Sequence, residues 1–566
     1  MRFFYFLFLL LLSSCTSGPK KVTHDECARL PTPPFSELKN RSLSDSEAIY
    51  IRTSSIKETV SSLQKVLSAP HLQRAHLEEL CFQLFQKLAE SDDLDTTIMT
   101  LLATSSTHHP LSRSITKHLL HSPSPLIQLV AVQSLFQTND ADSLLVEALR
   151  SNFIAVRFEA AWQLAKKRSR NSFFHIDALY SKLPEEFHPH MAELFAQEGS
   201  SGSIHRLRQM LYDAKDEVVV SSLLAIGKYS ISELSNETLS LTAHSPHILE
   251  ALAYALHCNE GSLARDRLLA LSAHHNPHVQ LQALLSRIAQ GELPLIDIVA
   301  KKAEQGDLYA LSALRSLPSL PQISQPPLSK VYTTNYALAL LEHKDPAVVP
   351  YLQELLALSE DEILLPAFSP ANTHQYWDLS TLYSFPEPSR PMLYEHSLVT
   401  IENLLAQTVE LDESAFLDVA QFVFQQGRIE LYPMVLSLLK NKRSDGAISL
   451  LQQEASRVGA PYNRVAASLG LIQLNVLPEE SLKEVLEFTR EKKDQPWRHP
   501  LPHVFSTQYI EKRHQNTTSA QLYVEALETL AQSGSEASIS LLKEELELVP
   551  THFLPFVVGA LLHATL

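Results

Sequence analysis

Glycine, cysteine and blocks of positive charge are scarce in this chain of 566 residues, and each shortage excludes a class of protein. With only 13 glycines, the sequence is poor in the residue that tight β-turns and phosphate-binding loops require, which argues against a β-rich or nucleotide-binding protein. Its 4 cysteines lie too far apart for a disulfide scaffold. No long block of Lys or Arg offsets the formal net charge of −16, so the surface as a whole should repel nucleic acid.

Short catalytic motifs are missing as well. The sequence contains no Gly-rich phosphate loop, no Gly-x-Ser-x-Gly and no Cys-x-x-Cys. None of its 25 histidines is followed by Glu, and neighbouring histidines such as His274 and His275 do not align in any repeat. Carboxylates are numerous, but none is paired at a distinctive spacing. We therefore predict no catalytic, cofactor-binding or metal-binding residue and no cofactor.

A repeated helical pattern is the strongest positive feature. In the stretch from 124 to 167, apolar residues at relative positions 0, +4, +5 and +8 occur twice, 29 residues apart. They are Ile127, Ala131, Val132 and Leu135, followed by Val156, Ala160, Ala161 and Leu164. This spacing places the four side chains on one helix face, and the small middle pair lets a second helix approach closely. One such helix cannot bury its apolar face alone, so the repetition predicts stacking.

The same pattern continues along the chain at intervals of 29 to 31 residues. Position 0 falls at Ile127, Val156, Phe187, Val218, Ile248 and Val279, and position +8 is apolar in all of these repeats except the last, at Arg287. A second helix lies between successive starts, as in the stretch ADSLLVEALR from 141 to 150. The predicted fold is therefore all-α, an α-solenoid or superhelix built from helix pairs of about 30 residues.

The predicted helices share a start signal. Ser124-Pro125, Ser245-Pro246, Asn276-Pro277 and Asp345-Pro346 precede position 0 by the same offset, with Val348 as a further start. Ser, Asn or Asp can cap a helix while Pro occupies its first turn without wasting an amide.

The cap-Pro start and the apolar core of these repeats resemble HEAT repeats, in particular the short bacterial form also found in phycobilin lyases. The closest matches are the stretch Asp345-Pro-Ala-Val348 and Val156-Arg157 with Ala160-Ala161. The resemblance implies an α-solenoid. It covers about 230 residues, and most repeats lack the arginine that follows position 0 in the family.

The N-terminus reads as a secretory signal. Arg2 precedes an apolar run of about ten residues, too short to span a bilayer as an ordinary helix. The end of this run, Leu12-Ser-Ser-Cys15, resembles the bacterial lipobox, which implies that Cys15 becomes acylated and anchors the chain. Thr16 after the cysteine favours the outer membrane by the same resemblance. The alternative is a plain signal peptide that happens to end in a cysteine.

The predicted organisation of the chain follows from these patterns. It comprises a signal peptide (1–14), a polar tether (15–59), capping helices and repeats (60–364), a Pro/aromatic insert (365–392), divergent repeats (393–491), an aromatic and basic insert (492–516), and C-terminal repeats with a cap (517–566). Cys81 and Cys258 fall in helical patterns, where we expect buried free thiols.

The two inserts carry the candidate partner contacts. These are Tyr376 and Trp377 in the first insert, and Trp497, Arg498 and Arg513 in the second. Trp, Tyr and Arg are the residue types that anchor protein interfaces. The alternative is that these side chains pack the inserts back onto the solenoid.

The sequence thus predicts a lipid-anchored, non-catalytic scaffold that binds protein partners in the bacterial cell envelope, on the outer membrane facing the periplasm. A solenoid offers a long surface made from one helix of each pair, which suits protein ligands. The alternative is an envelope enzyme or chaperone-like modifier that acts on a small molecule or a tetrapyrrole. Binding to nucleic acid is not expected.

Overall fold

The computed structural model describes residues 55–67, 74–106, 112–135, 141–169, 171–321, 330–357, 401, 404–491 and 515–565. Within these ranges the regular elements are helices and no strand occurs, which confirms the predicted all-α fold. No helix in this part of the chain is long and apolar enough to cross a bilayer. The chain divides into two compact units, and one of the boundaries between them falls inside a helix, between Arg464 and Val465.

Unit 2 holds the middle of the chain. Its helices are α8 (Asp142–Ala148), α9 (Ile154–Lys167), α10 (Ser172–Tyr180), α11 (His188–Glu198), α12 (Ser201–Met210), α13 (Asp216–Tyr229), α14 (Ser235–Ser240), α15 (Pro246–Ala255), α16 (Ser262–Ser272), α17 (Pro277–Ala289), α18 (Ile296–Glu304), α19 (Leu308–Ala313), α20 (Lys330–Glu342), α21 (Val349–Leu356), α25 (Glu413–Gln426), α26 (Tyr432–Lys442) and α27 (Asp445–Ala455).

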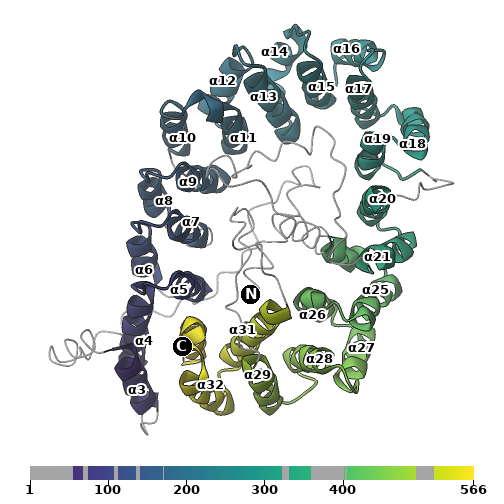
Figure 1. The fold of residues 1–566 in the computed structure, drawn as a ribbon. Coiled ribbons are helices and arrows are strands. Elements are labelled where there is room, and N and C mark those ends of the chain that lie inside the picture. Colours follow the sequence, from purple (N-terminus) through teal and green to yellow (C-terminus); the bar gives the residue numbers. More distant parts are fainter. Residues whose placement is uncertain are drawn as a thin grey trace, which may run out of the picture. The chain divides into compact units, whose positions relative to one another are not determined.

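Helices α9 to α17 stack in two rows (Figure 1). In one row, α9 contacts α11, α11 contacts α13, α13 contacts α15 and α15 contacts α17. We call these helices the inner row, because they line the inner side of the curve that unit 2 follows. In the outer row, α10 contacts α12 and α14 contacts α16. Consecutive helices of the chain alternate between the rows, which is the arrangement of helix-pair repeats that the sequence predicts.

The predicted repeat positions, which we call the seam, are buried. Position 0 is buried at Ile127, Val156, Phe187, Val218, Ile248 and Val279, and the pairs at +4 and +5 are buried in the same repeats. At position +8, Arg287 is the exception that the sequence shows, and its guanidinium pairs with Glu292 at 2.5 Å instead of entering the core. The alternation of small and large side chains therefore determines how closely the helices approach.

The capping signal acts at most of the predicted helix starts. Asn276 accepts hydrogen bonds from the amides of His278 and Val279 at 2.9 and 3.3 Å. Asp345 accepts one from Ala347, at the start of the short 3₁₀ helix η8 (Pro346–Val348) that leads into α21. Ser124 caps α7 (Pro125–Ser134) in the same way, whereas Ser245 stands at the N-cap of α15 without a side-chain bond.

Polar contacts join neighbouring helices of the outer row. Arg206 on α12 pairs with Asp177 on α10, and Arg208 on α12 pairs with Glu237 on α14, each at 2.5 Å and across 29 residues of chain. Arg267 on α16 donates to the backbone carbonyls of Leu239 and Leu241 at the end of α14. Because these contacts span 26 to 29 residues, close to one repeat length, the charged side chains connect equivalent parts of successive repeats.

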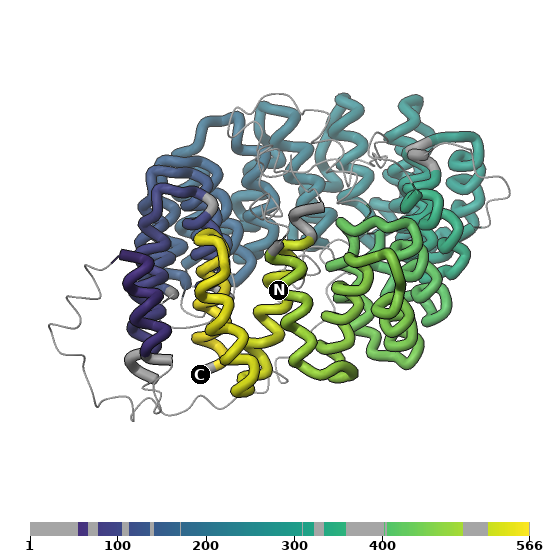
Figure 2. The backbone as a smooth tube through the Cα atoms, turned by 60° about the horizontal axis from the view of Figure 1, so that its bottom comes forward, coloured from purple at the N-terminus to yellow at the C-terminus, as the bar shows by residue number. Residues whose placement is uncertain are grey.

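Unit 1 contains helices from the N-terminal and the C-terminal parts of the chain. Its helices are α3 (Ile56–Leu67), α4 (Arg74–Ala89), α5 (Leu94–Ser106), α6 (Ser112–Leu119), α7, α29 (Leu482–Glu491), α31 (Gln515–Ser533), α32 (Glu536–Leu548) and α33 (Leu554–Thr565), with most of α28 (Pro461–Gln473). The last helix, α33, packs against α4 and α5, and Figure 2 shows the yellow C-terminal helices beside the purple N-terminal ones.

Hydrogen bonds reinforce unit 1. Gln64 on α3 donates to Glu547 on α32 at 2.9 Å, and the buried Glu545 accepts from the Tyr523 hydroxyl at 2.6 Å and from Arg490. The sequence predicts a separate cap at each end of the repeats. That organisation stays a prediction; what the structure shows within unit 1 is that α33 contacts both α4 and α5.

Candidate functional site on the inner row of unit 2

The residues predicted as functional lie outside the part of the chain that the structure describes. These are the lipidation candidate Cys15 and the contact candidates Tyr376, Trp377, Trp497, Arg498 and Arg513. Their predicted roles stay predictions. A candidate site within the described residues comes instead from the repeat register.

Position +6 of each repeat lies on the helix face opposite the seam. At about 100° per residue, it stands roughly 200° from the centre of the face that positions 0, +4 and +8 share. On the inner row this position holds Trp162, Glu193, Leu224, Tyr254 and Leu285, spaced by 30 or 31 residues. Trp162, Tyr254 and Leu285 are half-buried, and Glu193 and Leu224 are buried. The row is therefore mainly apolar and aromatic, with one carboxylate set into it.

That carboxylate is held by residues at the end of α13. Glu193 is only 5% exposed, so its charge needs partners. The ammonium of Lys228 forms an ion pair with Oε1 of Glu193, and the Tyr229 hydroxyl donates to the same oxygen at 3.2 Å. Lys228 itself stays exposed at the surface. Because the two charges of the pair cancel, the buried carboxylate stands in the inner row without an unbalanced charge.

A glycine in α13 lets α15 approach closely at this point. A Cβ on Gly227 would lie 2.7 Å from the ring of Tyr254 and 3.3 Å from the Cα of Ala255. Glycine in a helix interior costs about 1 kcal/mol relative to alanine, which makes its presence here a matter of packing space. Burial, together with the nearby Cys258 and Glu193, raises the pKa of Tyr254 to about 12.

Cys258 and His257 lie next to Tyr254, in the 3₁₀ helix η5 (Leu256–Cys258). The Sγ atom of Cys258 is 3.3 Å from Nε2 of His257, 3.4 Å from the carbonyl oxygen of Gly227 and 3.5 Å from Oγ of Ser230. Both described cysteines are free, as predicted, but only Cys81 is buried. Cys258 is half-buried, because η5 leaves its sulfur at the end of α15 and not in the seam.

The environment of Cys258 favours its ionisation. Burial favours the neutral thiol, but the hydrogen bond and charge of His257, with the hydroxyl of Ser230, outweigh it and lower the pKa of Cys258. Burial likewise opposes the charged imidazole, but the contacts with Cys258 and the Tyr254 carbonyl raise the pKa of His257. Ser230 ends α13 in the left-handed conformation at φ 52°, an unusual backbone for a residue with a side chain.

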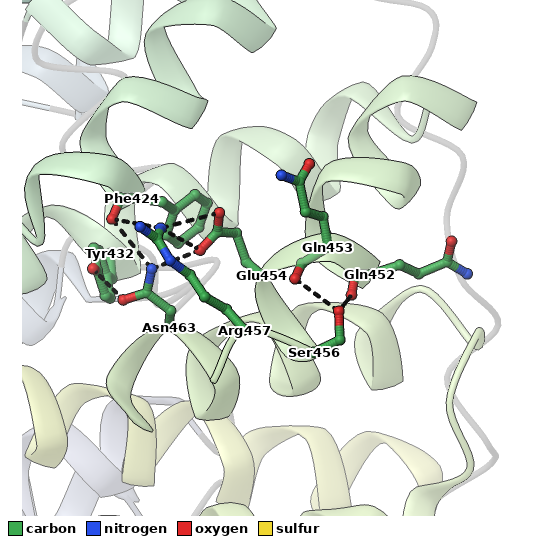
Figure 3. A network of polar contacts seen from close by, with 8 residues as sticks. All are labelled: Phe424, Tyr432, Gln452, Gln453, Glu454, Ser456, Arg457 and Asn463. Carbon is green, nitrogen blue, oxygen red and sulfur yellow. Dashed lines mark hydrogen bonds and ion pairs between the residues drawn. The ribbon is translucent and has the colours of Figure 1, made fainter. Parts of the chain in front are cut away.

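A second buried polar network, in α25 to α28, has a structural role (Figure 3). Asn463 donates to Oε2 of Glu454 at 2.6 Å and to the Phe424 carbonyl at 3.2 Å, and it accepts from the Tyr432 hydroxyl at 2.5 Å. Arg457 donates to Glu454 at 3.1 Å. These groups satisfy one another within the fold, so the network stabilises the junction of helices and offers no open site.

Several histidines elsewhere contact aromatic rings or one another. His188 stacks on Tyr180 with centroids 4.1 Å apart, and the rings of His274 and His275 are also 4.1 Å apart. In the portion of the chain that the structure describes, no group of three or more His, Cys, Asp or Glu side chains could hold a metal ion.

Sequence reasoning missed this site for two reasons. The seam positions account for the apolar periodicity of the sequence. Position +6 has no fixed residue type, so its row of side chains can be recognised only after the register of the repeats is known. His257-Cys258 matches no motif, and its chemistry depends on the turn that brings Ser230 and Gly227 beside it. The lone Gly227 inside a helical pattern is the one signal that indicates close packing there.

No protein-family model matches the sequence, and comparison with curated proteins gives no match. What the site can do is therefore inferred from its own geometry.

Proposed function

We propose that the protein is a non-catalytic, helical-repeat scaffold that binds protein partners through the inner row of unit 2. One observation supports this most strongly: α9, α11, α13, α15 and α17 contact one another in sequence, so the half-buried Trp162, Tyr254 and Leu285 belong to one continuous row of helices. Side chains that recur every 30 or 31 residues then form one extended surface, which matches an elongated protein ligand better than a compact small molecule.

The composition of this surface also suits a protein ligand. Half-buried Trp162 and Tyr254 can each bury a large area with little loss of side-chain entropy, and aromatic residues dominate the binding energy of many interfaces.

A photo-crosslinking experiment tests this surface. A photoreactive residue replaces either Gln197 on α11 or Ala289 on α17, both on the inner row, or Lys182, which follows outer-row helix α10. The scaffold function predicts that the two inner-row probes capture the same partner protein from intact cells, and that the Lys182 probe does not. Equal capture from all three positions, or no shared product at the two inner-row positions, would contradict it.

The proposal includes the membrane anchor and the envelope. From the lipobox resemblance at Cys15 we infer a lipoprotein of the bacterial cell envelope, on the outer membrane facing the periplasm. From the repeat pattern we infer that the repeats are HEAT-like. Replacing Cys15 by Ala should abolish labelling with a radioactive fatty acid and release the chain from membranes, whereas Cys27→Ala should change neither. A Cys15→Ala chain that is still labelled would disprove the anchor and leave partner binding by the repeats untouched.

A further inference from the structure

We propose that the inner row of unit 2 binds a partner segment that inserts an arginine side chain, and that Glu250 on α15 pairs with its guanidinium. The inference rests on the proposed scaffold function and names the chemistry of the partner.

Glu250 is the polar exception at its position in the repeats. It stands at position +2 of α15, where the other repeats hold apolar residues: Leu129, Phe158, Pro189, Val220 and Leu281. Because Glu250 precedes Tyr254 by four residues, the two side chains lie about 40° apart around the helix, on the face opposite the seam. Glu250 therefore belongs to the same surface as Tyr254.

The carboxylate of Glu250 has no partner in the described part of the chain. Its side chain forms no hydrogen bond or ion pair there, although only 9% of the residue is exposed. On α13 and α17, the helices that flank α15, the equivalent residues Val220 and Leu281 are apolar and buried. Burial alone raises the pKa of Glu250 to about 7. Because an enclosed carboxylate without a partner costs free energy, its presence in the inner row needs an explanation.

Other buried carboxylates show how this protein compensates such groups. Three of them pair with a basic side chain of the chain itself: Glu193 with Lys228, Glu454 with Arg457 and Glu545 with Arg490. Glu250 is buried to a similar degree and lacks such a cation. A bound segment can supply it.

The basic side chains at the ends of the flanking helices are already engaged. On α13, Lys228 pairs with Glu193, and on α17, Arg287 pairs with Glu292. Neither charge contributes to the pKa of Glu250, which responds to burial alone. The cation that completes this part of the surface therefore comes from the partner.

The surroundings of Glu250 favour arginine. On the same helix face, Pro246 is exposed one turn earlier and Tyr254 is half-buried one turn later, so the carboxylate lies beside accessible surface. Cβ atoms four residues apart in a helix are separated by about 6 Å, so a guanidinium that pairs with Glu250 can also contact the ring of Tyr254. A guanidinium stacks on aromatic rings, donates two parallel hydrogen bonds to a carboxylate and is less strongly hydrated than an ammonium group.

Two fluorescent peptide pools test the pairing. The pools share randomised flanks, and their central residue is arginine in one pool and citrulline, its uncharged isostere, in the other. Each pool is mixed with the immobilised full chain in detergent at about pH 8, where a carboxyl with a pKa of about 7 is mostly ionised. We expect the wild-type chain to retain the arginine pool at least about fivefold better than the citrulline pool.

Two variants assign the preference to one residue. Glu250→Gln keeps the shape of the side chain and removes its charge, so the ratio of the two pools should fall to about one. Glu260→Gln removes an exposed carboxylate that follows η5, and it should keep the preference.

The outcomes separate this inference from the scaffold function. Equal retention of both pools by the wild-type chain would overturn the arginine pairing and leave the scaffold function standing. Retention of neither pool would contradict both. A preference that persists in Glu250→Gln with an unchanged circular dichroism spectrum would also overturn the pairing, because another group would then recognise the arginine.

Discussion

Removing the Asn463 side chain should open the junction of α26, α27 and α28, because its amide joins three buried partners (Figure 3). In Asn463→Ala, the carboxylate of Glu454 loses a donor at 2.6 Å, and the Phe424 carbonyl loses one at 3.2 Å. The Tyr432 hydroxyl also loses its acceptor, Oδ1 of Asn463 at 2.5 Å. The side chain of Tyr432 has no exposed surface, so water cannot replace that acceptor.

The cost follows from these three contacts. A hydrogen bond to a charged group contributes about 1.5–3 kcal/mol, and a buried hydroxyl left without a partner costs about 1–3 kcal/mol. Glu454 keeps its ion pair with Arg457 at 3.1 Å, so its charge still has a partner. We expect Asn463→Ala to lower the local free energy of unfolding by about 3–4 kcal/mol, since part of each cost relaxes.

A double-mutant cycle separates the Tyr432 contact from the rest. Tyr432→Phe alone should cost about 1–2 kcal/mol. In Asn463→Ala/Tyr432→Phe no hydroxyl is orphaned, so the double variant should be more stable than the sum of the single changes by about 1–2 kcal/mol. Amide hydrogen exchange of peptides from α26 to α28 measures these local free energies, because stacked repeats can open in parts.

The control is Ser456→Ala, whose hydroxyl donates only to carbonyls of its own helix, at Gln452 and Gln453. It should change the exchange free energy by less than about 0.5 kcal/mol. Additivity of Asn463→Ala and Tyr432→Phe within about 0.5 kcal/mol would refute the reasoning, because it would mean that the hydroxyl never depended on Asn463.

Three further predictions concern the inner row and its helix starts. Gly227→Ala should destabilise α13 and α15 by about 1–3 kcal/mol in thermal unfolding despite better helix propensity, because the new methyl meets the Tyr254 ring; a stabilised variant would contradict this. Asn276→Ala should cost about 1 kcal/mol by removing two cap bonds, whereas Ser245→Ala should cost almost nothing, and equal losses would be contrary to the structure. Glu250→Gln should stabilise the chain at pH 8 and not at pH 4.

The direction for Glu250 follows from burial, which raises its pKa to about 7. Because this value lies above that of an unfolded carboxyl, the folded chain binds a proton that the unfolded chain releases, and stability falls between about pH 4.5 and about pH 7. The loss is on the order of 3 kcal/mol at most. Urea unfolding of Glu250→Gln should lack this slope, and Glu260→Gln, at an exposed position, should retain it. An unaltered slope in Glu250→Gln would show that another group titrates.

Much of the fold can be predicted from the sequence, because repetition multiplies a weak local signal. The seam residues from Ile127 to Val279 are all buried as expected, and Asn276 and Asp345 cap as their types suggest. Ser245 shows the limit of this reasoning. The residue type predicts a cap, but whether its hydroxyl reaches an amide depends on a side-chain rotation that sequence spacing does not encode.

Most of the candidate site could not be predicted from the sequence. The predicted contacts at Trp497 and elsewhere fall outside the described residues, and nothing in the spacing of His257 and Cys258 distinguishes a half-buried thiol from a core cysteine.

The sequence by itself determined the secondary structure, the repeat length and the seam, since helical periodicity and capping act over a few residues. Only the tertiary structure decided that α33 packs against α4 and α5, and that the backbone turn at Ser230 and the gap at Gly227 meet Tyr254 and Cys258. These contacts join segments that are separated in sequence by roughly one repeat or by nearly the whole length of the chain. They depend on how closely the helices approach, which is set by the packing of all the side chains together.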